Sequence, residues 1–296
     1  MSFFSGRGYF QGLFFFMTVI LISCLNDIIV KFMGQRLDAL QVIFFRFFFG
    51  LITLFPFIVS RGKQVFKTRQ LGVNIIRGLF GAMSIFLYTR SVIRLPLVEV
   101  VTILWTIPLF VLILSIIFLR EEVSGLRWIA TIIGFVGLSC ITLYDSGTSV
   151  SLKLIYLVPI SSAFLFAVQD VMIKKMVDNE NRTTMLFYFA LVTSVITFLP
   201  ALLVWKTPTL FEYSMLFLLG AGGNLIQYFI FKAFSATDLS ALSPFRYTEF
   251  LFSAFFAFIF FAEIPGINVL LGALILIPST LYLAYSETKK KVVATS

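Results

Sequence analysis

The sequence contains no histidine, only two cysteines and few charged residues. Histidine is the commonest general base and metal ligand near neutral pH, so the usual residue for both roles is missing. The cysteines, Cys24 and Cys140, lie in separate apolar runs and provide neither a disulfide framework nor the spacing of a metal site. We therefore expect no metal ion and no cofactor.

Charged residues make up 12% of the chain and hydrophobic residues 59%, with a mean hydropathy of +1.01. A soluble domain is about half apolar and roughly a quarter charged. The 38 phenylalanines suit a lipid solvent instead. The composition predicts an all-α membrane protein surrounded by membrane lipid.

Ten apolar runs, each long enough for a membrane-spanning helix of roughly 20 residues, are separated by short turns and charges. The first run shows no small-residue cleavage pattern, so we expect it to remain as a helix. The connections leave no room for a domain outside the membrane. The expected transmembrane helices span residues 10–31, 39–59, 71–91, 97–119, 126–144, 153–174, 184–205, 213–234, 239–262 and 266–285.

The positive charges indicate an orientation. With both termini in the cytoplasm, fourteen Lys and Arg residues lie near the inner helix ends and six near the outer ends. An excess of positive charge on the cytoplasmic side is the rule for such proteins. The net charge of +9 is explained by these helix ends, so we expect no nucleic-acid partner.

The two halves of the chain resemble each other. The run from Asn26 to Lys31 and the run from Gln169 to Lys174 each contain an amide, an acid and then a Lys four residues on. Thr53–Pro56 and Thr197–Pro200 follow at nearly the same distance. We interpret these matches as an internal repeat, although apolar sequences also align by chance.

The repeat divides the chain into residues 1–146 and 147–296, with five helices in each unit. An odd number of spans inserts the second copy upside down. Inverted repeats are typical of secondary transporters, whose binding site lies near the membrane midplane between the copies. The sequence therefore predicts two inverted five-helix repeats around a central site.

Several ionisable residues lie inside the expected helices, where each costs roughly 2.5–3.5 kcal/mol at the helix centre. Such residues tend to face a cavity or a charged partner. Topology places some near the outer side and others near the inner side, which suits two gates around a central site. The alternative is a set of fixed structural ion pairs, such as Asp27 with Arg46. The residues are Asp27, Arg46, Arg77, Glu99, Asp170, Arg246 and Glu249, with Lys31 and Lys174 beside two of the acids.

The expected helix 239–262 carries the strongest candidate for a binding site. Arg246 and Glu249 are three residues apart and share a face. Pro244 lacks an N–H and predicts a kink there. A carboxylate would bind to Arg246 and an ammonium to Glu249. Tyr247 adds an aromatic ring nearby, on a different side of the helix.

Two other helices contribute polar or aromatic side chains. Asn224 and Gln227 share one face of the expected helix 213–234 and could read an amide or a base, or serve helix packing. Trp105 lies near mid-membrane, although Trp prefers the interfaces. It could face a cation or simply fill the core.

The duplicated five-helix unit, with Glu121 and Glu263 each preceding the last helix of a half, resembles the EamA-type ten-helix carriers of the drug/metabolite transporter superfamily. The resemblance covers essentially the whole chain. It implies a transporter of a small polar metabolite and leaves the substrate open.

A closer resemblance rests on particular motifs. These are Asn26-Asp27 with Lys31, Gly34, Arg36-Leu37, Phe44-Phe45-Arg46-Phe47-Phe48-Phe49, Arg77-Gly78, Asp170 with Lys174-Lys175, and Pro244-Phe245-Arg246-Tyr247-Thr248-Glu249. They are similar to the S-adenosylmethionine uptake transporters of intracellular bacteria, although Arg90, Arg94 and Glu99 depart from that pattern. The resemblance implies import of S-adenosylmethionine in exchange for S-adenosylhomocysteine, across a bacterial inner membrane.

The chemistry of S-adenosylmethionine fits the candidate residues. Arg246 or Arg77 would hold its carboxylate, and Glu249 or Asp170 its ammonium. Trp105 or Tyr247 would face the sulfonium, and Asn224 with Gln227 would read the adenine. The remaining charges (Asp27, Arg46, Lys31, Glu99 and Lys174) would form gates or ion pairs.

Other functions are also compatible with parts of the pattern. An exporter of amino acids or other metabolites would share the same architecture. An intramembrane aspartyl protease would need Asp27 and Asp170 together, yet topology places them on opposite sides and no Gly-x-Gly-Asp run is present. A channel would need a ring of repeated filter residues, which the sequence does not show. The oligomeric state stays open.

Overall fold

The computed structural model describes residues 6–94, 100, 103–146 and 154–261, together with positions 274, 277, 278, 281, 282 and 285. Every regular element in this part of the chain is a helix. Six of its helices are long and apolar enough to cross a membrane, and two shorter apolar helices accompany them. The prediction of an all-helical, multi-span membrane protein is therefore confirmed. The expected helix 97–119 begins outside the described residues, and nearly all of 266–285 lies outside them.

The six long helices and α6 begin and end within a few residues of the expected spans. The long helices are α1 (Gly6–Met33), α2 (Ala39–Arg61), α3 (Leu71–Arg94), α7 (Leu157–Met176), α8 (Arg182–Leu203) and α9 (Leu210–Ala236). The others include α5 (Ile107–Leu114), continued by the π-helical turn η2 (Ser115–Leu119), α6 (Gly125–Ser146), α10 (Leu239–Leu242), the 3-10 helix η4 (Ser243–Thr248) and α11 (Glu249–Phe261).

Side-chain caps fix where three of the long helices begin. Asp38 accepts a hydrogen bond from a backbone N–H in the first turn of α2, and Asn181 does the same for α8. Thr209 and Glu212 form a reciprocal capping box at the start of α9. These side chains satisfy N–H groups that have no partner within the helix.

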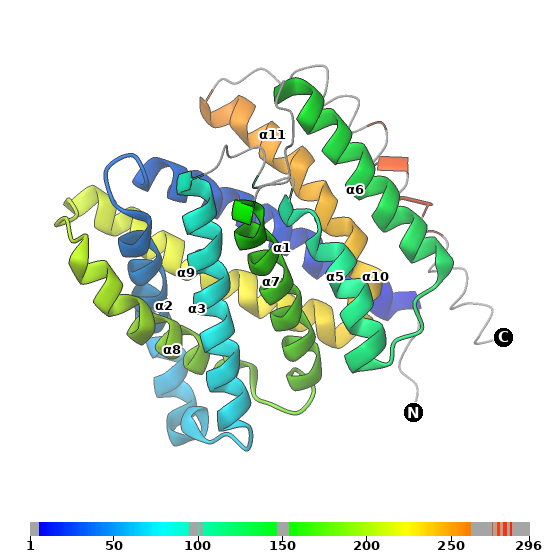
Figure 1. Ribbon diagram of the computed structural model, residues 1–296. Coiled ribbons are helices and arrows are strands. Elements are labelled where there is room, and N and C mark those ends of the chain that lie inside the picture. Colours follow the sequence, from blue (N-terminus) through cyan, green and yellow to red (C-terminus); the bar gives the residue numbers. More distant parts are fainter. Residues whose placement is uncertain are drawn as a thin grey trace.

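The helices pack in pairs that are far apart in sequence (Figure 1). α1 packs along α9, and α3 packs along α7. α2 contacts both α8 and α9, while α8 also contacts α3. α5 packs on α7, and α11 packs on α1. Helices of the two halves of the chain are therefore interleaved.

Glycines allow α2 and α9 to approach closely. A Cβ added to Gly220 would meet the backbone nitrogen of Gly50 at 2.8 Å, so no larger residue fits there. Asn224, one turn further along α9, donates to the Gly50 carbonyl oxygen at 2.7 Å. Small residues with an interhelical hydrogen bond are typical of helix packing in membranes.

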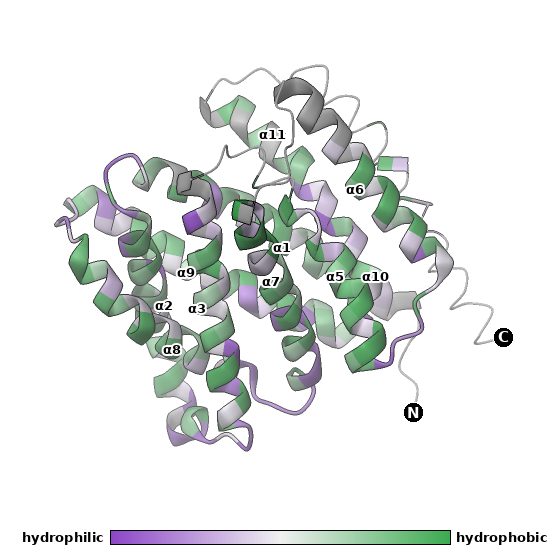
Figure 2. Cartoon of the chain, viewed as in Figure 1, coloured by the Kyte–Doolittle hydropathy of each residue, from purple (hydrophilic) through white to green (hydrophobic). Residues whose placement is uncertain are grey.

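Large apolar side chains cover the outside of the bundle. Leu199 and Leu203 on α8 are 69% and 88% exposed, as expected for side chains that face lipid. Hydrophilic residues gather on the loops at the helix ends, and apolar residues cover the long helices (Figure 2). This is the distribution that a membrane-embedded bundle requires.

Candidate substrate-binding site

An ion pair joins η4 to α7. Arg246 Nη2 lies 2.5 Å from Asp170 Oδ2, and the side chains are 26% and 10% exposed. Asp170 lies on α7, which is long and apolar enough to cross a membrane, and the Arg246 guanidinium also lies 5.8 Å from the ring of Phe16 on α1, a second such helix. Intramembrane charges that remain accessible typically line a polar cavity or a substrate path. The sequence predicted both residues as binding residues, and the structure places them in direct contact.

The backbone around Arg246 is interrupted, as Pro244 predicts. α10 ends at Leu242, and six residues of 3-10 helix precede α11, which begins at Glu249. Proline removes an N–H donor, and a 3-10 stretch within a helix often marks a hinge or a functional site. Residues 239–248 are all buried except Arg246. Arg246 is therefore the one side chain of this segment that extends into accessible space.

Arg77, on α3, is completely buried beside this pair. Its guanidinium donates to the backbone oxygen of Met185 at 3.0 Å and to Gln227 Oε1 at 2.7 Å. The rings of Phe189 and Phe231 lie 4.4 and 5.3 Å from it. Asp170 attracts it electrostatically without a hydrogen bond between them. In this conformation Arg77 links α3 to α8 and α9 and presents no surface to a ligand.

A second group of charges lies at α1, α2 and α11. Asp27 is exposed, and it interacts electrostatically with Arg46 and Glu249. The hydroxyl of half-buried Tyr88, on α3, is within electrostatic range of both carboxylates. Asp27 and Arg46 thus attract each other without the direct ion pair that the sequence suggested as an alternative, and a second acid lies nearby. Among the described residues, no group of three or more His, Cys, Asp or Glu is arranged to hold a metal ion.

Tyr247 and Trp105 contact each other. The Tyr247 hydroxyl donates to the Trp105 carbonyl oxygen at 3.1 Å, and the Tyr247 ring packs on Gly134 of α6. Trp105 lies edge-on to Phe250, with ring centroids 5.8 Å apart. Tyr247 is only 1% exposed, so here it anchors η4, whereas Trp105 is half-buried. Substrate contact by these rings stays a prediction.

The amides of α9 serve helix packing in this conformation. Asn224 donates to the Gly50 carbonyl oxygen and, at 2.8 Å, to Thr53 Oγ1 on α2. Gln227 accepts from Arg77. This is the alternative that the sequence left open for them.

Lys174 closes one end of α9. Its ammonium donates to the carbonyl oxygens of Phe234 at 2.5 Å and Thr237 at 2.8 Å, so it satisfies backbone groups at the helix C-terminus. Glu99 and the side chain of Lys31 lie outside the described residues, so their predicted gating roles stay predictions.

Sequence reasoning missed three contributors near the site. Tyr88 gave no signal beyond a Tyr inside an apolar helix. The sequence presents Glu121 only as a marker of the repeat, and Arg127 only as one of the positive charges near the inner helix ends. Both contact the first turn of α10, and Arg127 is 4% exposed. Nothing in the local sequence around Arg127 indicates that its side chain is buried.

A charged contact closes one edge of the bundle. Arg36, in the loop after α1, forms a two-point salt bridge with Glu212 and donates to the Thr207 carbonyl oxygen at 2.9 Å. The hydrogen bond to Glu212 raises the pKa of Arg36 above its ordinary value. This contact holds the α1–α2 loop against the α8–α9 loop.

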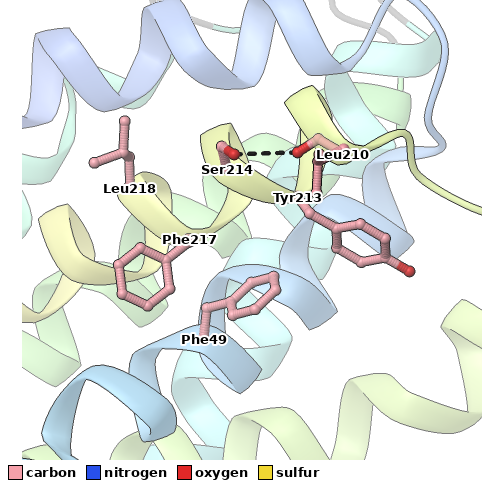
Figure 3. Close-up of a pocket in the computed structure, with 6 residues that line it drawn as sticks. All are labelled: Phe49, Leu210, Tyr213, Ser214, Phe217 and Leu218. Carbon is pink, nitrogen blue, oxygen red and sulfur yellow. Dashed lines mark hydrogen bonds between the residues drawn. The ribbon is translucent and has the colours of Figure 1, made fainter.

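A shallow groove lies between α2 and the N-terminal half of α9, and its lining is almost entirely apolar (Figure 3). The Ser214 hydroxyl donates back to the Leu210 carbonyl oxygen at 3.1 Å and is not free for a ligand. The groove therefore does not suit a polar substrate. Its lining residues are Phe49, Leu210, Tyr213, Ser214, Phe217 and Leu218.

Residues 10–143 and 153–285 each match the EamA-like transporter family. The chain belongs to this family. It is therefore a transporter, and the intramembrane protease alternative no longer stands.

Individual relatives narrow the comparison. The chain is 42% identical to the S-adenosylmethionine uptake transporter of Rickettsia bellii over 96% of both chains. It is 29% identical to the riboflavin transporter of Vibrio cholerae over 86% of this chain and 85% of that one. A crystal structure of a protein with 16% identity superposes with a TM-score of 0.80 over 97% of this chain and 99% of that one. That likeness shows the fold alone.

Proposed function

We propose that this protein carries S-adenosylmethionine across a bacterial inner membrane. The observation that carries the proposal is the 42% identity, over 96% of both chains, to a protein named for that uptake. A riboflavin transporter is similar at the lower level of 29%, so the family alone leaves the substrate open. The higher identity and the charges of the site together favour S-adenosylmethionine.

The accessible charges suit a zwitterion that carries an extra positive charge. Arg246 offers a planar fork to the substrate carboxylate, in place of its present partner Asp170. Glu249, which begins α11, would then attract the ammonium. Half-buried Trp105 would offer an aromatic face to the sulfonium.

The buried and helix-packing candidates need a rearrangement before they can contact the substrate. Arg77 and Tyr247 are enclosed in this conformation, and Asn224 and Gln227 are hydrogen-bonded to other helices. Their proposed roles, for the carboxylate, the sulfonium and the adenine, belong to a second conformation.

We further propose ten helices in two inverted repeats, residues 1–146 and 147–296. The helix pairings support this arrangement, because exchanging the repeats preserves them. The α1–α9 pair corresponds to α7–α3, the α2–α9 pair to α8–α3, and the α1–α11 pair to α7–α5. The two separate family matches, over residues 10–143 and 153–285, also support this division.

Rocking of one repeat against the other would then expose the site to each side in turn. S-adenosylhomocysteine, which lacks the sulfonium charge, would leave as S-adenosylmethionine enters. Asp27, Arg46 and Lys174, with Lys31 and Glu99, would make and break the contacts that close each side.

The test is uptake of radiolabelled S-adenosylmethionine into proteoliposomes preloaded with S-adenosylhomocysteine, compared with empty ones. Uptake that the preload stimulates, and that unlabelled S-adenosylmethionine competes, supports both substrate and exchange. Equal uptake with and without the preload would show that transport does not require exchange for S-adenosylhomocysteine. If the folded protein takes up no S-adenosylmethionine, this compound is not its substrate. That outcome favours an EamA-type carrier of another metabolite, including an exporter.

A further inference from the structure

The buried segment that carries Arg246 is fixed at its start by a carboxylate from the first half of the chain. Glu121 accepts from the backbone N–H groups of Leu239 and Ser240, both at 2.9 Å. It also accepts from the Ser240 hydroxyl at 2.5 Å. N–H groups in a first helical turn have no partner inside the helix, so one acid satisfies two of them.

A special turn places Glu121 at this position. The π-helical turn η2 ends at Leu119, and the next residue, Arg120, adopts the left-handed conformation with φ 56°. The N–H of Glu121 donates back to the Ser115 carbonyl oxygen at 3.2 Å, which closes the turn. A left-handed conformation is costly for a residue other than glycine. The chain keeps this turn where it directs Glu121 toward α10.

Arg127 joins the same contact from α6. Its guanidinium donates to Ser240 Oγ at 2.7 Å and to Asp238 Oδ2 at 3.1 Å. The Ser240 hydroxyl therefore accepts from Arg127 and donates to Glu121. An acid and a base of the first half thus hold the first turn of α10 between them.

Residues further along the segment also contact the first half of the chain. The Ser243 hydroxyl donates to the Pro108 carbonyl oxygen at 3.2 Å, and Tyr247 donates to Trp105. The Tyr247 ring fills the space where a Cβ of Gly134 would lie. Residues within and beside α5 and α6 therefore fix the start, the middle and the end of the segment that carries Arg246.

We infer that Glu121 and Arg127 are positioning residues for Arg246. They set how far the segment advances along its axis, and so where the guanidinium lies relative to Asp170 and to an incoming carboxylate. Arg246 lies in η4, which directly follows the short helix α10 that Glu121 and Arg127 hold, and no other side chain of residues 239–248 reaches accessible space. This inference deepens the proposed function and uses its substrate as one readout.

The experiment measures uptake of radiolabelled S-adenosylmethionine in the presence of either of two unlabelled competitors, S-adenosylmethionine itself or the analogue that lacks its carboxylate. The ratio of the two competitor concentrations that halve uptake gives the preference for the carboxylate. The wild-type carrier prefers the carboxylate form, and Arg246→Ala removes that preference. Glu121→Gln reduces the preference roughly tenfold, since a displacement of about 1 Å in a binding group has effects of this order or more. Ser240→Ala, a milder change, reduces it less.

Glu180→Gln is the matched control, because Glu180 bonds Thr68 and the Asn181 N–H and does not contact α10. It retains the wild-type preference. A purely structural role for Glu121 would lower the amount of folded carrier and leave the preference of that carrier unchanged. That outcome would overturn the inference while the proposed function stands.

A second readout needs no substrate. A thiol is introduced by Arg246→Cys in a background with Cys24→Ser and Cys140→Ser, and its reaction with a small maleimide is timed. Adding Glu121→Gln changes this rate severalfold if Glu121 and Arg127 position the segment, whereas an equal rate overturns the inference. If the wild-type carrier takes up no S-adenosylmethionine, the proposed function fails and this rate alone decides the inference.

Discussion

Asp170 and Arg246 stabilise each other where neither charge is stable alone. Each is flanked by apolar helices, and removing one partner of a buried pair costs about 3–5 kcal/mol. The pair also keeps a guanidinium accessible to a ligand carboxylate. At the residue scale, the same contact thus serves folding and, in our proposal, recognition.

Changing Arg246 to Ala is expected to reduce S-adenosylmethionine uptake at least roughly tenfold, since a charge-assisted two-point contact is lost. Arg246→Lys restores little, because an ammonium lacks the planar fork. Uptake is measured per amount of carrier in the membrane.

The control for stability is Arg246→Gln combined with Asp170→Asn, which leaves no orphaned charge. This double variant is expected to reach near wild-type amounts and still to transport poorly. Wild-type uptake by Arg246→Ala or by the double variant would show that Arg246 does not bind the substrate.

At the scale of elements, close helix contact explains the glycines of α9. Gly220 lies against the backbone of α2, where a Cβ would approach the Gly50 nitrogen to 2.8 Å. A helix pair that packs this closely tolerates no added volume on that face, because both backbones would have to move apart.

Gly220→Ala is expected to lower the thermal unfolding midpoint of the detergent-purified protein, with a cost of about 1–3 kcal/mol typical of overpacking. Gly72→Ala is the matched control. Gly72 also lies in a helix, and a Cβ added there would meet no atom within 4 Å outside its own helical turn. Equal midpoints for the two variants would contradict the close packing of α2 and α9.

At the scale of the whole molecule, the proposed orientation places the α1–α2 and α8–α9 loops outside and the α2–α3 loop in the cytoplasm. A membrane-impermeant maleimide is expected to label Lys206→Cys in intact cells. Lys63→Cys is expected to react only after permeabilisation. The opposite result would reverse the orientation, and equal labelling of both would contradict the predicted topology.

A bound substrate is also expected to stabilise the whole protein. At 100 times its Kd, a ligand that binds only the native state adds about 2.7 kcal/mol to the free energy of unfolding. S-adenosylmethionine should therefore raise the thermal unfolding midpoint of the wild type but not that of Arg246→Ala. A competing metabolite that raises the midpoint more would identify a different substrate.

The fold class and most helix positions followed from the sequence. A lipid solvent requires long apolar helices with internal backbone bonding, so hydropathy alone locates them. Charges inside those helices marked Asp170 and Arg246, and Pro244 marked the break in the helix that carries Arg246. These features are local, because each depends only on a few residues that are neighbours in the sequence.

The tertiary structure decided which side chains meet. The Arg246–Asp170 contact joins residues 76 positions apart, and Glu121 reaches α10 across 118. It also enclosed Arg77 and Tyr247, which the sequence presented only as candidate binding residues. Sequence by itself located the long apolar helices that the structure describes, because partitioning into lipid is a property of each segment. Partner choice and burial depend on which segments pack together, and only the assembled bundle decides that.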